Sequence, residues 1–149
     1  MFKGKTCVIT GSAGGIGRAL ALELARCGAN LALSDIDVDK LAETTQDARN
    51  LGAVVHSAHL DVADHAEIYQ YAKTVEALFG SVHQLYNNAG ISGGGELNEM
   101  SDALIQRVID INLLGVLHGS RAFLPSLEKS GQGKLVNISS LNGFAAMPG

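Results

Sequence analysis

Short apolar or β-branched runs alternate along the chain with amphipathic segments of helical length, and this alternation constrains the fold more than any other feature. Strands are predicted over residues 6–10, 30–34, 54–59, 84–87 and 134–138, and helices over residues 16–27, 38–51, 63–79 and 101–124. Strands and helices that alternate in this way form βαβ units with a parallel sheet. With 149 residues, of which 46% are hydrophobic, the chain has the size of one domain around one core. We therefore predict a single doubly wound α/β domain over residues 1–149.

The third predicted helix carries one apolar stripe, whereas the fourth is apolar on more than one side. In the third helix the apolar residues follow the i, i+3, i+4, i+7 spacing of one buried face; they are Ile68, Tyr71, Ala72, Val75, Leu78 and Phe79. The fourth helix leaves little polar surface, with Leu104, Ile105, Val108, Ile109, Ile111, Leu113, Leu114, Val116 and Leu117. One side can pack on the sheet, and the other needs a later helix of the chain, another subunit, or both. We expect a homo-oligomer formed through this helix.

Charge and composition argue against several classes of protein. A net charge of −4 and a pI near 5.6, without a cluster of Lys or Arg, are unlike those of a protein that binds nucleic acid or an anionic membrane surface. No apolar run reaches the roughly 18 residues of a membrane span, and the N-terminus has no signal-peptide pattern. Cys7 and Cys27 form no CxxC pair, so both are expected to be buried free thiols. These features predict a soluble protein of the cytoplasm.

The segment after the first predicted strand has the composition of a phosphate-binding turn. It reads TGSAGGIG from Thr10 to Gly17 and leads directly into a helix. Glycine suits the positive φ of a tight turn, the approach of a backbone to a pyrophosphate, and close contact between helix and strand. The unpaired N–H groups and the positive dipole end of the helix favour a phosphate without any basic side chain. For this segment alone, a glycine turn without a ligand is the alternative interpretation.

Asp35 ends the second predicted strand, at the place where a carboxylate can accept hydrogen bonds from the adenosine ribose of a dinucleotide. Such a carboxylate would repel a 2′-phosphate, and no Arg or Lys follows until Lys40, so NAD is favoured over NADP. The alternative role of Asp35 is an Asx turn before the second helix, although Asp37 is better placed for that role. Because strand, glycine turn, helix and acidic residue occur in the right order, they predict a Rossmann-type dinucleotide site.

The spacing Gly-x-x-x-Gly-x-Gly, here Gly11, Gly15 and Gly17, resembles that of the short-chain dehydrogenase/reductase family. Further similarities follow in the order of the family. Asp61 resembles the residue that contacts the adenine ring, and the segment Asn-Asn-Ala-Gly over residues 87–90 is similar to the segment beside the cofactor ribose. Asn112 resembles the helix asparagine of the catalytic tetrad, and Ser140 resembles the catalytic serine. The resemblance runs from residue 5 to about residue 143.

This resemblance implies a sheet with strand order 3-2-1-4-5 and assigns roles to particular residues. The implied cofactor-binding residues are Gly11, Ser12, Gly15, Ile16, Gly17, Asp35, Asp61, Val62, Asn88, Ala89 and Gly90. The implied catalytic residues are Asn112, which would support a water chain, and Ser140, which would orient the substrate oxygen. Taken singly, Asp61 could cap the third helix, the paired asparagines could form a turn, and Asn112 could mark a helix kink. His59, Asp61 and His65 lie close in sequence, but a metal site is not expected there, because they fall on different predicted elements.

The family also keeps a Tyr-x-x-x-Lys motif about a dozen residues after the serine, and the 149 residues contain none at that place. A Tyr-x-x-x-Lys does occur from Tyr69 to Lys73, but it precedes the fourth strand and reads as an exposed i, i+4 pair. Without the tyrosine base and its lysine, we expect cofactor binding without turnover. We also expect the sequence to be the N-terminal part of a longer chain, with the fifth strand, near Leu135, Val136 and Ile138, on an uncovered sheet edge.

Three functions remain open from the sequence. The first is an NAD-dependent oxidoreductase that in its full-length form interconverts a small alcohol and a carbonyl compound. The second is a module that binds NAD or a partner and catalyses nothing, and the third is a methyltransferase with a similar Rossmann start. The segment 87–90 and Ser140 argue against the third. The substrate cannot be named, because specificity is set by loops after the strands; of these, residues 91–96, with predicted mobility at residues 93–95, and residues 141–149 are present.

Overall fold

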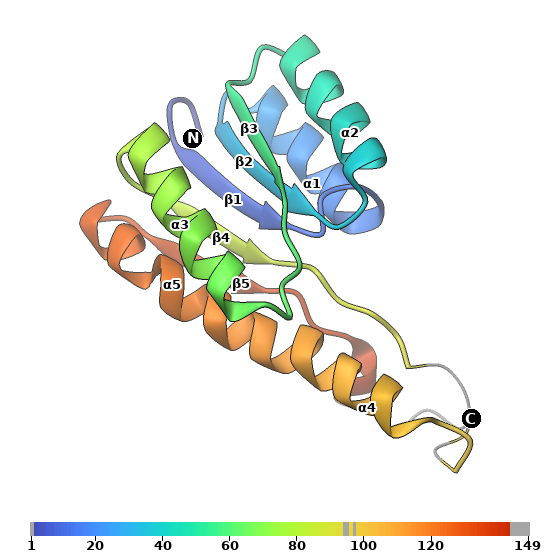
Figure 1. Ribbon diagram of the computed structural model, residues 1–149. Helices are drawn as coiled ribbons and strands as arrows, with labels where there is room; N and C mark the ends of the chain where they lie inside the picture. The colour runs from blue at the N-terminus through green and yellow to red at the C-terminus, as the bar shows by residue number, and fades with distance from the viewer. Residues whose placement is uncertain (1, 94–95, 97, 144–149) are drawn as a thin grey trace.

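A parallel sheet forms the centre of the chain (Figure 1). The computed structural model describes residues 2–93, 96 and 98–143. Over these residues the strands are β1 (Thr6–Thr10), β2 (Asn30–Asp35), β3 (Val55–His59), β4 (Gln84–Asn87) and β5 (Lys134–Asn137). Their order across the sheet is β3-β2-β1-β4-β5, and all neighbours are parallel. The predicted doubly wound α/β fold and its strand order are confirmed.

Helices connect the strands and cover both faces of the sheet. They are α1 (Gly15–Arg26), α2 (Val38–Asn50), α3 (His65–Phe79), α4 (Asp102–Ile109) and α5 (Val116–Lys129), with a π-helical segment η1 (Asp110–Gly115) and a 3-10 turn η2 (Leu141–Gly143). The Asp37 side chain accepts a hydrogen bond from the Lys40 amide and caps α2 as predicted. Asp64 accepts hydrogen bonds from the amides of Ala66 and Glu67 at the start of α3. Asp64, and not Asp61, is therefore the cap of α3.

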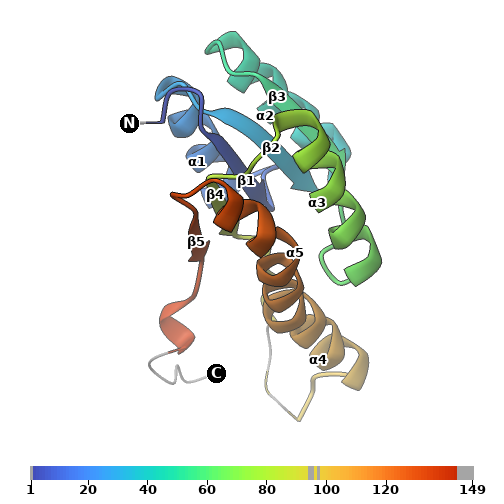
Figure 2. The same cartoon turned by 90° about the vertical axis from the view of Figure 1, so that its left-hand side faces the viewer.

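Alternate residues of β1 point into two separate cores. Val8 belongs to the apolar cluster that includes Ile68 of α3 and Phe123 of α5, whereas Cys7 and Ile9 belong to the cluster formed with α1 and α2. Figure 2 shows α1 and α2 on one side of the sheet and α3 with α5 on the other. Burial on both faces is typical of the central strand of a parallel sheet. It also raises the pKa of the Cys7 thiol to about 12, so that this thiol stays protonated.

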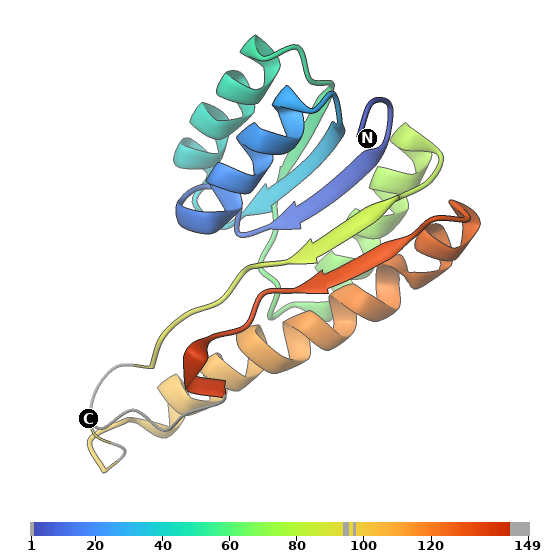
Figure 3. The same cartoon turned by 180° about the vertical axis from the view of Figure 1, so that it is seen from behind.

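The chain changes direction across the sheet at β1. It runs from β1 through β2 to β3 at one edge and then returns to β4 on the other side of β1. Figure 3 shows that the strands all point the same way, so the segments that follow them meet at one edge of the sheet. Because the connections after β1 and β4 lead to opposite faces, a crevice forms between them, where doubly wound sheets bind ligands.

The predicted fourth helix is longer than expected and contains a π-helical interruption. It runs through α4, η1 and α5 from Asp102 to Lys129, whereas the sequence predicted a continuous α-helix over residues 101–124. Pro125 lies inside α5 and does not end it. A proline removes one backbone hydrogen bond at a cost of about 3 kcal/mol, and burial of Phe123 and Leu127 on the sheet offsets that cost.

This long helix packs only part of its apolar surface. Ile111 is buried, but the side chains of Leu113 and Leu117 are 62% and 57% exposed, and Leu124 is 48% exposed. The expectation that one side of the helix remains uncovered in the single chain is therefore confirmed. Figure 3 shows the helix running beside β5 and extending beyond the ends of the strands.

Three local expectations differ from the structure or fall outside it. Leu78 is 57% exposed although it was assigned to the buried stripe of α3, because it lies at the margin of that stripe, about 80° around the helix from Ile68. Cys27 is an exposed free thiol and not a buried one, since it forms the C-cap of α1 and faces solvent. The mobility predicted at residues 93–95 falls largely on residues 94 and 95, which lie outside the described residues.

The fifth strand forms one edge of the sheet, as expected. β5 pairs with β4 alone among the described strands, and Leu135 and Ile138 are 40% and 37% exposed.

Within the described part of the chain, none of the helices combines the length and hydropathy needed to cross a lipid bilayer.

Candidate nucleotide-binding cleft

A cleft of about 330 Å³ opens at the edge of the sheet to which the strands point. Five segments line it: the turn after β1 (Gly11, Gly14, Ile16), the end of β2 (Asp35, Ile36), the loop after β3 (Leu60, Asp61, Val62), the loop after β4 (Asn88, Ala89, Gly90, Ile91) and the long helix (Arg107, Ile111). The fold thus brings residues up to 100 positions apart to one surface at the crevice between β1 and β4.

Close packing holds the start of α1 against the end of β1. A Cβ atom at Gly17 would lie 2.1 Å from the carbonyl oxygen of Gly11, and a Cβ atom at Gly11 would lie 2.8 Å from the Cα of Ala89. Gly11 also has a φ of +68°, in the left-handed region. Neither position accepts a side chain without movement of the backbone. These two glycines therefore set how closely α1 approaches the loop after β4.

The start of α1 lies at the cleft, with Gly14 and Ile16 in its lining. Gly14 is the N-cap, and among the described residues no side chain caps this helix and no acidic residue lies in its first turn. The first N–H groups of a helix have no partner within it, and the helix dipole gives them a partial positive charge. Apart from the neighbouring residues and the backbone of α1 itself, no described atom lies within 4 Å of the place that a Cβ of Gly15 would take. The helix start is therefore open to an anionic group.

Asn88 ties the glycine turn to the loop after β4. Its Nδ2 donates hydrogen bonds to the carbonyl oxygens of Thr10 and Gly11, each at 3.0 Å. The hydroxyl oxygen of Thr10 accepts hydrogen bonds from the amides of Asn88 and Ala89, at 3.1 and 3.0 Å. These bonds cross from β1 to β4 and fix the floor of the cleft.

Asp35 lines the cleft and also holds the glycine turn. Its Oδ2 accepts a hydrogen bond from the Ala13 amide at 2.8 Å, and its Oδ1 accepts one from the Asp37 amide at 3.0 Å. The second bond is the Asx turn considered as an alternative role for Asp35. Each carboxylate oxygen can accept a further hydrogen bond, so the Asx turn does not exclude contact with a ligand.

Asp61 forms an ion pair with Arg107 across the cleft wall. Its Oδ1 accepts a hydrogen bond from the Ala63 amide at 3.0 Å, and its Oδ2 accepts one from Nη2 of Arg107 at 2.8 Å. Partial burial acts to raise the pKa of Asp61, but the hydrogen bonds from Ala63 and Arg107 outweigh it and hold that pKa below its ordinary value. Asp61 is therefore a carboxylate at neutral pH.

Most of the predicted cofactor-binding residues line this cleft, and the others shape it from behind. Gly11, Ile16, Asp35, Asp61, Val62, Asn88, Ala89 and Gly90 lie on its surface. Ser12 is fully buried, and its hydroxyl donates a hydrogen bond to the Ile9 carbonyl oxygen at 2.7 Å. Gly15 and Gly17 lie at the start of α1. Sequence reasoning missed Gly14, Ile36, Leu60, Ile91, Arg107 and Ile111 as lining residues. The first four lie within or next to segments that the sequence singled out, whereas Arg107 and Ile111 lie in the long helix, where nothing in their own positions distinguishes them.

The two predicted catalytic residues lie at the same edge of the sheet but do not line this cleft. Asn112 lies in η1, and its side-chain amide bonds both backbone groups of Ile91: Oδ1 accepts from the Ile91 amide at 2.9 Å, and Nδ2 donates to the Ile91 carbonyl oxygen at 2.8 Å. Ser140 follows β5.

Asn87, the last residue of β4, is 3% exposed, and its Nδ2 donates to Ser120 and to Asn137 at 3.1 and 2.9 Å. Asn87 therefore joins β4, β5 and α5, which the sequence did not predict.

The described lining of the cleft includes neither a metal-binding cluster nor the Tyr-x-x-x-Lys segment of residues 69–73. Among the described residues, no group of three or more His, Cys, Asp or Glu side chains is arranged to hold a metal ion. Tyr69 packs its ring edge-on against His118, and neither Tyr69 nor Lys73 is among the described lining residues.

Comparison with known proteins identifies the family. The sequence model of the short chain dehydrogenase family matches residues 5–149. The chain belongs to the short-chain dehydrogenase family. The resemblance seen in the glycine spacing is thereby confirmed.

Relatives within the short-chain dehydrogenases include bacterial and human proteins. A Mycobacterium tuberculosis protein named "Putative oxidoreductase SadH" is 51% identical over 148 residues, which are 99% of this chain and 54% of that protein. Human estradiol 17-beta-dehydrogenase 11 is 36% identical over 145 residues, 97% of this chain and 48% of that protein. The chain spans about half the length of these curated relatives.

Solved structures of similar proteins have the same fold. A short chain dehydrogenase/reductase from Burkholderia phymatum, in complex with NAD, is 38% identical with a TM-score of 0.95, and the match covers 99% of this chain and 53% of that one. An alcohol dehydrogenase from the archaeon Thermococcus sibiricus, complexed with 5-hydroxy-NADP, is 36% identical with a TM-score of 0.92, and the match covers 97% of this chain and 61% of that one. Similar structures thus contain either form of the nicotinamide cofactor.

Substitution at Gly17 tests the packing that forms the cleft. Gly17→Ala is expected to lower the free energy of unfolding by about 1 to 3 kcal/mol, because the new methyl group overlaps the Gly11 carbonyl and forces α1 away from β1. Gly14→Ala is the matched control, since no described atom beyond its neighbouring residues lies within 4 Å of its Cβ position and its φ of −159° suits any residue. Urea unfolding followed by circular dichroism measures both; equal stability of the two variants would contradict this account of Gly17.

Proposed function

We propose that the chain is the cofactor-binding part of an NAD-dependent oxidoreductase that interconverts an alcohol and a carbonyl compound. The observation that carries the proposal is the uncapped, glycine-lined start of α1, which opens into the same cleft as the carboxylate of Asp35. The oxidoreductases among the relatives support the reaction class.

The glycine turn and α1 would bind the diphosphate. Gly11 and Gly14 expose backbone without a side chain in the way, and the first N–H groups of α1 can donate to phosphate oxygens. Ile16 lies beside them on the cleft surface. No cationic side chain is needed at this point, because the dipole of the helix favours the negative charge.

Asp35 would bind the adenosine ribose and thereby favour NAD over NADP. Its carboxylate can accept hydrogen bonds from ribose hydroxyls, and it would repel a phosphate on the 2′ oxygen. The cation nearest to it in the following sequence, Lys40, is paired with Asp37 at 2.9 Å. A 2′-phosphate would therefore meet a negative charge and would have to compete with Asp37 for Lys40.

The bound nicotinamide would accept or supply the hydride. Ser140 would orient the substrate oxygen, and Asn112 would position the loop after β4 through its two hydrogen bonds to Ile91. The 149 residues contain no Tyr-x-x-x-Lys after Ser140, so they lack a tyrosine to take the hydroxyl proton. We propose that this chain binds the cofactor without turnover.

The long helix would form a subunit contact. Ile109, Leu113, Leu114 and Leu117 are each at least 36% exposed, and an apolar helix face of this kind is typical of an oligomer interface.

The free thiols of Cys7 and Cys27 support a reducing compartment such as the cytoplasm.

A second candidate function is an NAD-binding module that catalyses nothing in any form. The binding of both Asn112 amide atoms to Ile91 favours it, because that side chain then serves the shape of the cleft. Residues that follow Gly149 in a longer form of the chain would distinguish the two functions, since the oxidoreductase needs the tyrosine and the lysine there.

Replacement of Asp35 tests the cofactor preference. Asp35→Asn is expected to raise the affinity for NADPH relative to NADH by roughly tenfold, because the amide removes the repulsion of the 2′-phosphate. Asp39→Asn removes the same charge from an exposed site in α2 outside the cleft, and should leave the ratio unchanged. Isothermal titration calorimetry with both cofactors gives the two dissociation constants. An unaltered ratio in the Asp35→Asn variant, or no NADH affinity in the folded wild-type chain, would refute the proposal.

Turnover is the second test of the proposed function. The purified chain, with its mass verified, should bind NADH and yet oxidise secondary alcohols at least about 10² to 10⁴ times more slowly than ordinary enzymes, because a general base contributes that much to the rate. The absorbance of NADH at increasing enzyme concentration measures the rate. Alcohol oxidation at about 1 s⁻¹ or faster would show that another group takes the proton.

The oligomer proposal is tested on the exposed face of the long helix. The double substitution Leu113→Glu and Leu117→Glu should convert a dimer or larger species into a monomer, because charged side chains cannot be buried there without partners. Leu78→Glu, on the exposed part of α3, is the control and should leave the assembly intact. Sedimentation velocity reports the masses, and an unchanged mass in the double variant would place the interface elsewhere.

A further inference from the structure

We propose that Arg107 is a positioning residue for the base of the cofactor: it holds the Asp61 carboxylate in the orientation that accepts a hydrogen bond from the exocyclic amino group of adenine. The inference rests on the proposed function, because it assumes that a nicotinamide dinucleotide occupies the cleft. It assigns a role in base selection to a residue of the long helix.

Geometry provides the first support. Arg107 of α4 and Asp61 of the loop after β3 both line the cleft, and their side chains meet at 2.8 Å. The ion pair joins α4 to the loop after β3 at this point of the cleft. The Ala63 amide binds the other carboxylate oxygen at 3.0 Å, so both oxygens of Asp61 are fixed. Each oxygen keeps capacity to accept one more hydrogen bond.

Charge provides the second support. Among the described lining residues, Asp35 and Asp61 are negative and Arg107 alone is positive. A charged ligand that carries a diphosphate would otherwise enter a cleft with two uncompensated carboxylates. With Arg107 in place, Asp61 is neutralised while its remaining acceptor capacity is left for the ligand.

The exposure of the pair indicates that it contributes little to stability. The side chains of Arg107 and Asp61 are 40% and 30% exposed, and ion pairs with such exposure contribute little to folding. Removal of Arg107 would therefore leave the fold intact but allow the Asp61 side chain to rotate. Only a ligand that depends on the orientation of that carboxylate would be affected.

The chemistry of the base makes this orientation selective. An ionised carboxylate only accepts hydrogen bonds. The 6-amino group of adenine is a donor, whereas hypoxanthine carries a carbonyl oxygen at the same place, which is an acceptor and would repel the carboxylate. Apolar Ile36 and Val62, which also line the cleft, would contact either base without distinguishing the substituent at position 6. Discrimination between the two bases therefore reports on Asp61 and on the residue that positions it.

The experiment compares NADH with reduced nicotinamide hypoxanthine dinucleotide, by calorimetry, on the wild-type chain and three variants. The wild-type chain should bind NADH about tenfold more tightly than the hypoxanthine analogue. Arg107→Gln should weaken NADH binding about three- to tenfold and reduce the preference for adenine to about twofold, since an oriented hydrogen bond to a charged group is lost. Arg107→Lys, which keeps the charge but not the planar fork, should fall between.

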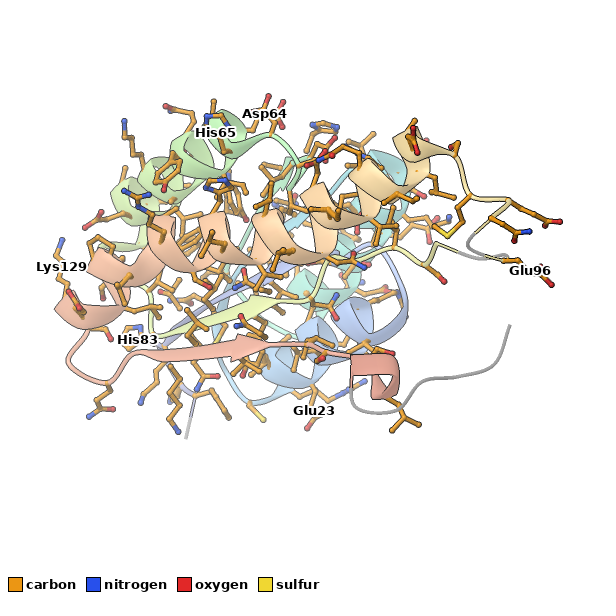
Figure 4. The ribbon with its side chains drawn as sticks, turned by 90° about the horizontal axis from the view of Figure 1, so that it is seen from below. Glu23, Asp64, His65, His83, Glu96 and Lys129 are labelled. Carbon is orange, nitrogen blue, oxygen red and sulfur yellow. The ribbon has the colours of Figure 1, made fainter. Side chains whose placement is uncertain are left out.

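The control variant is Lys129→Gln, which removes an ion pair of similar kind between α5 and α3, Lys129–Glu76 at 2.9 Å. Lys129 lies at the end of the long helix that is farther from Glu96, as Figure 4 shows. It does not line the cleft. This variant should keep the wild-type affinities and preference. Thermal unfolding of all variants shows whether any change in binding is a loss of fold.

The possible outcomes separate this inference from the proposed function. If the folded wild-type chain does not bind NADH, the proposed function fails. If it binds NADH but Arg107→Gln keeps the adenine preference, Arg107 does not position Asp61 and the inference is wrong. An increased preference in Arg107→Gln would also overturn it, because Arg107 would then contact the base itself.

Discussion

The close contact between the start of α1 and the end of β1 is the constraint on which the cleft depends. Gly17 and Gly11 meet at a distance that leaves no room for a Cβ, and Asn88 binds the carbonyl groups of Thr10 and Gly11 from the neighbouring strand. Movement of the helix start away from β1 would shift its unpaired N–H groups relative to the crevice between β1 and β4. The position of the helix start, and with it the site for an anion, follows from these glycines.

A second constraint is electrostatic. The cleft contains the carboxylates of Asp35 and Asp61, and yet its glycine-lined end is suited to a negatively charged group. These demands are compatible because they act at different places. The backbone dipole provides positive potential at the start of α1, while Asp35 is hydrogen-bonded by two amides and Asp61 by an amide and Arg107. Each carboxylate is thus stabilised by its own donors, and a ligand with hydroxyl or amino groups can approach them.

The sequence predicted the elements that local patterns define and missed the contacts that depend on the fold. The strands, the glycine turn and the acidic residue at the end of β2 could be predicted, since each signal lies within a few residues of sequence. Arg107 could not, because it is recognised only beside Asp61, which lies 46 positions away. The hydrogen bond from the Ala13 amide to Asp35 depends likewise on the neighbouring strand, whereas the Ser12 hydroxyl binds the carbonyl oxygen of Ile9, only three residues earlier. The π segment was missed because residues 101–124 show helical hydropathy throughout, and hydropathy does not report a change in hydrogen-bond register.

That π segment contacts two of the loops that line the cleft. On one side Asn112 binds both backbone groups of Ile91, and on another Gly115 approaches Val62 so closely that a Cβ would lie 2.9 Å from its carbonyl oxygen. Ile91 and Val62 both line the cleft. One turn of the long helix therefore supports the loops after β4 and after β3 together. Since the same helix carries Arg107 one to two turns earlier, a shift of this helix would move the Arg107 side of the cleft and the loop after β4 in the same step.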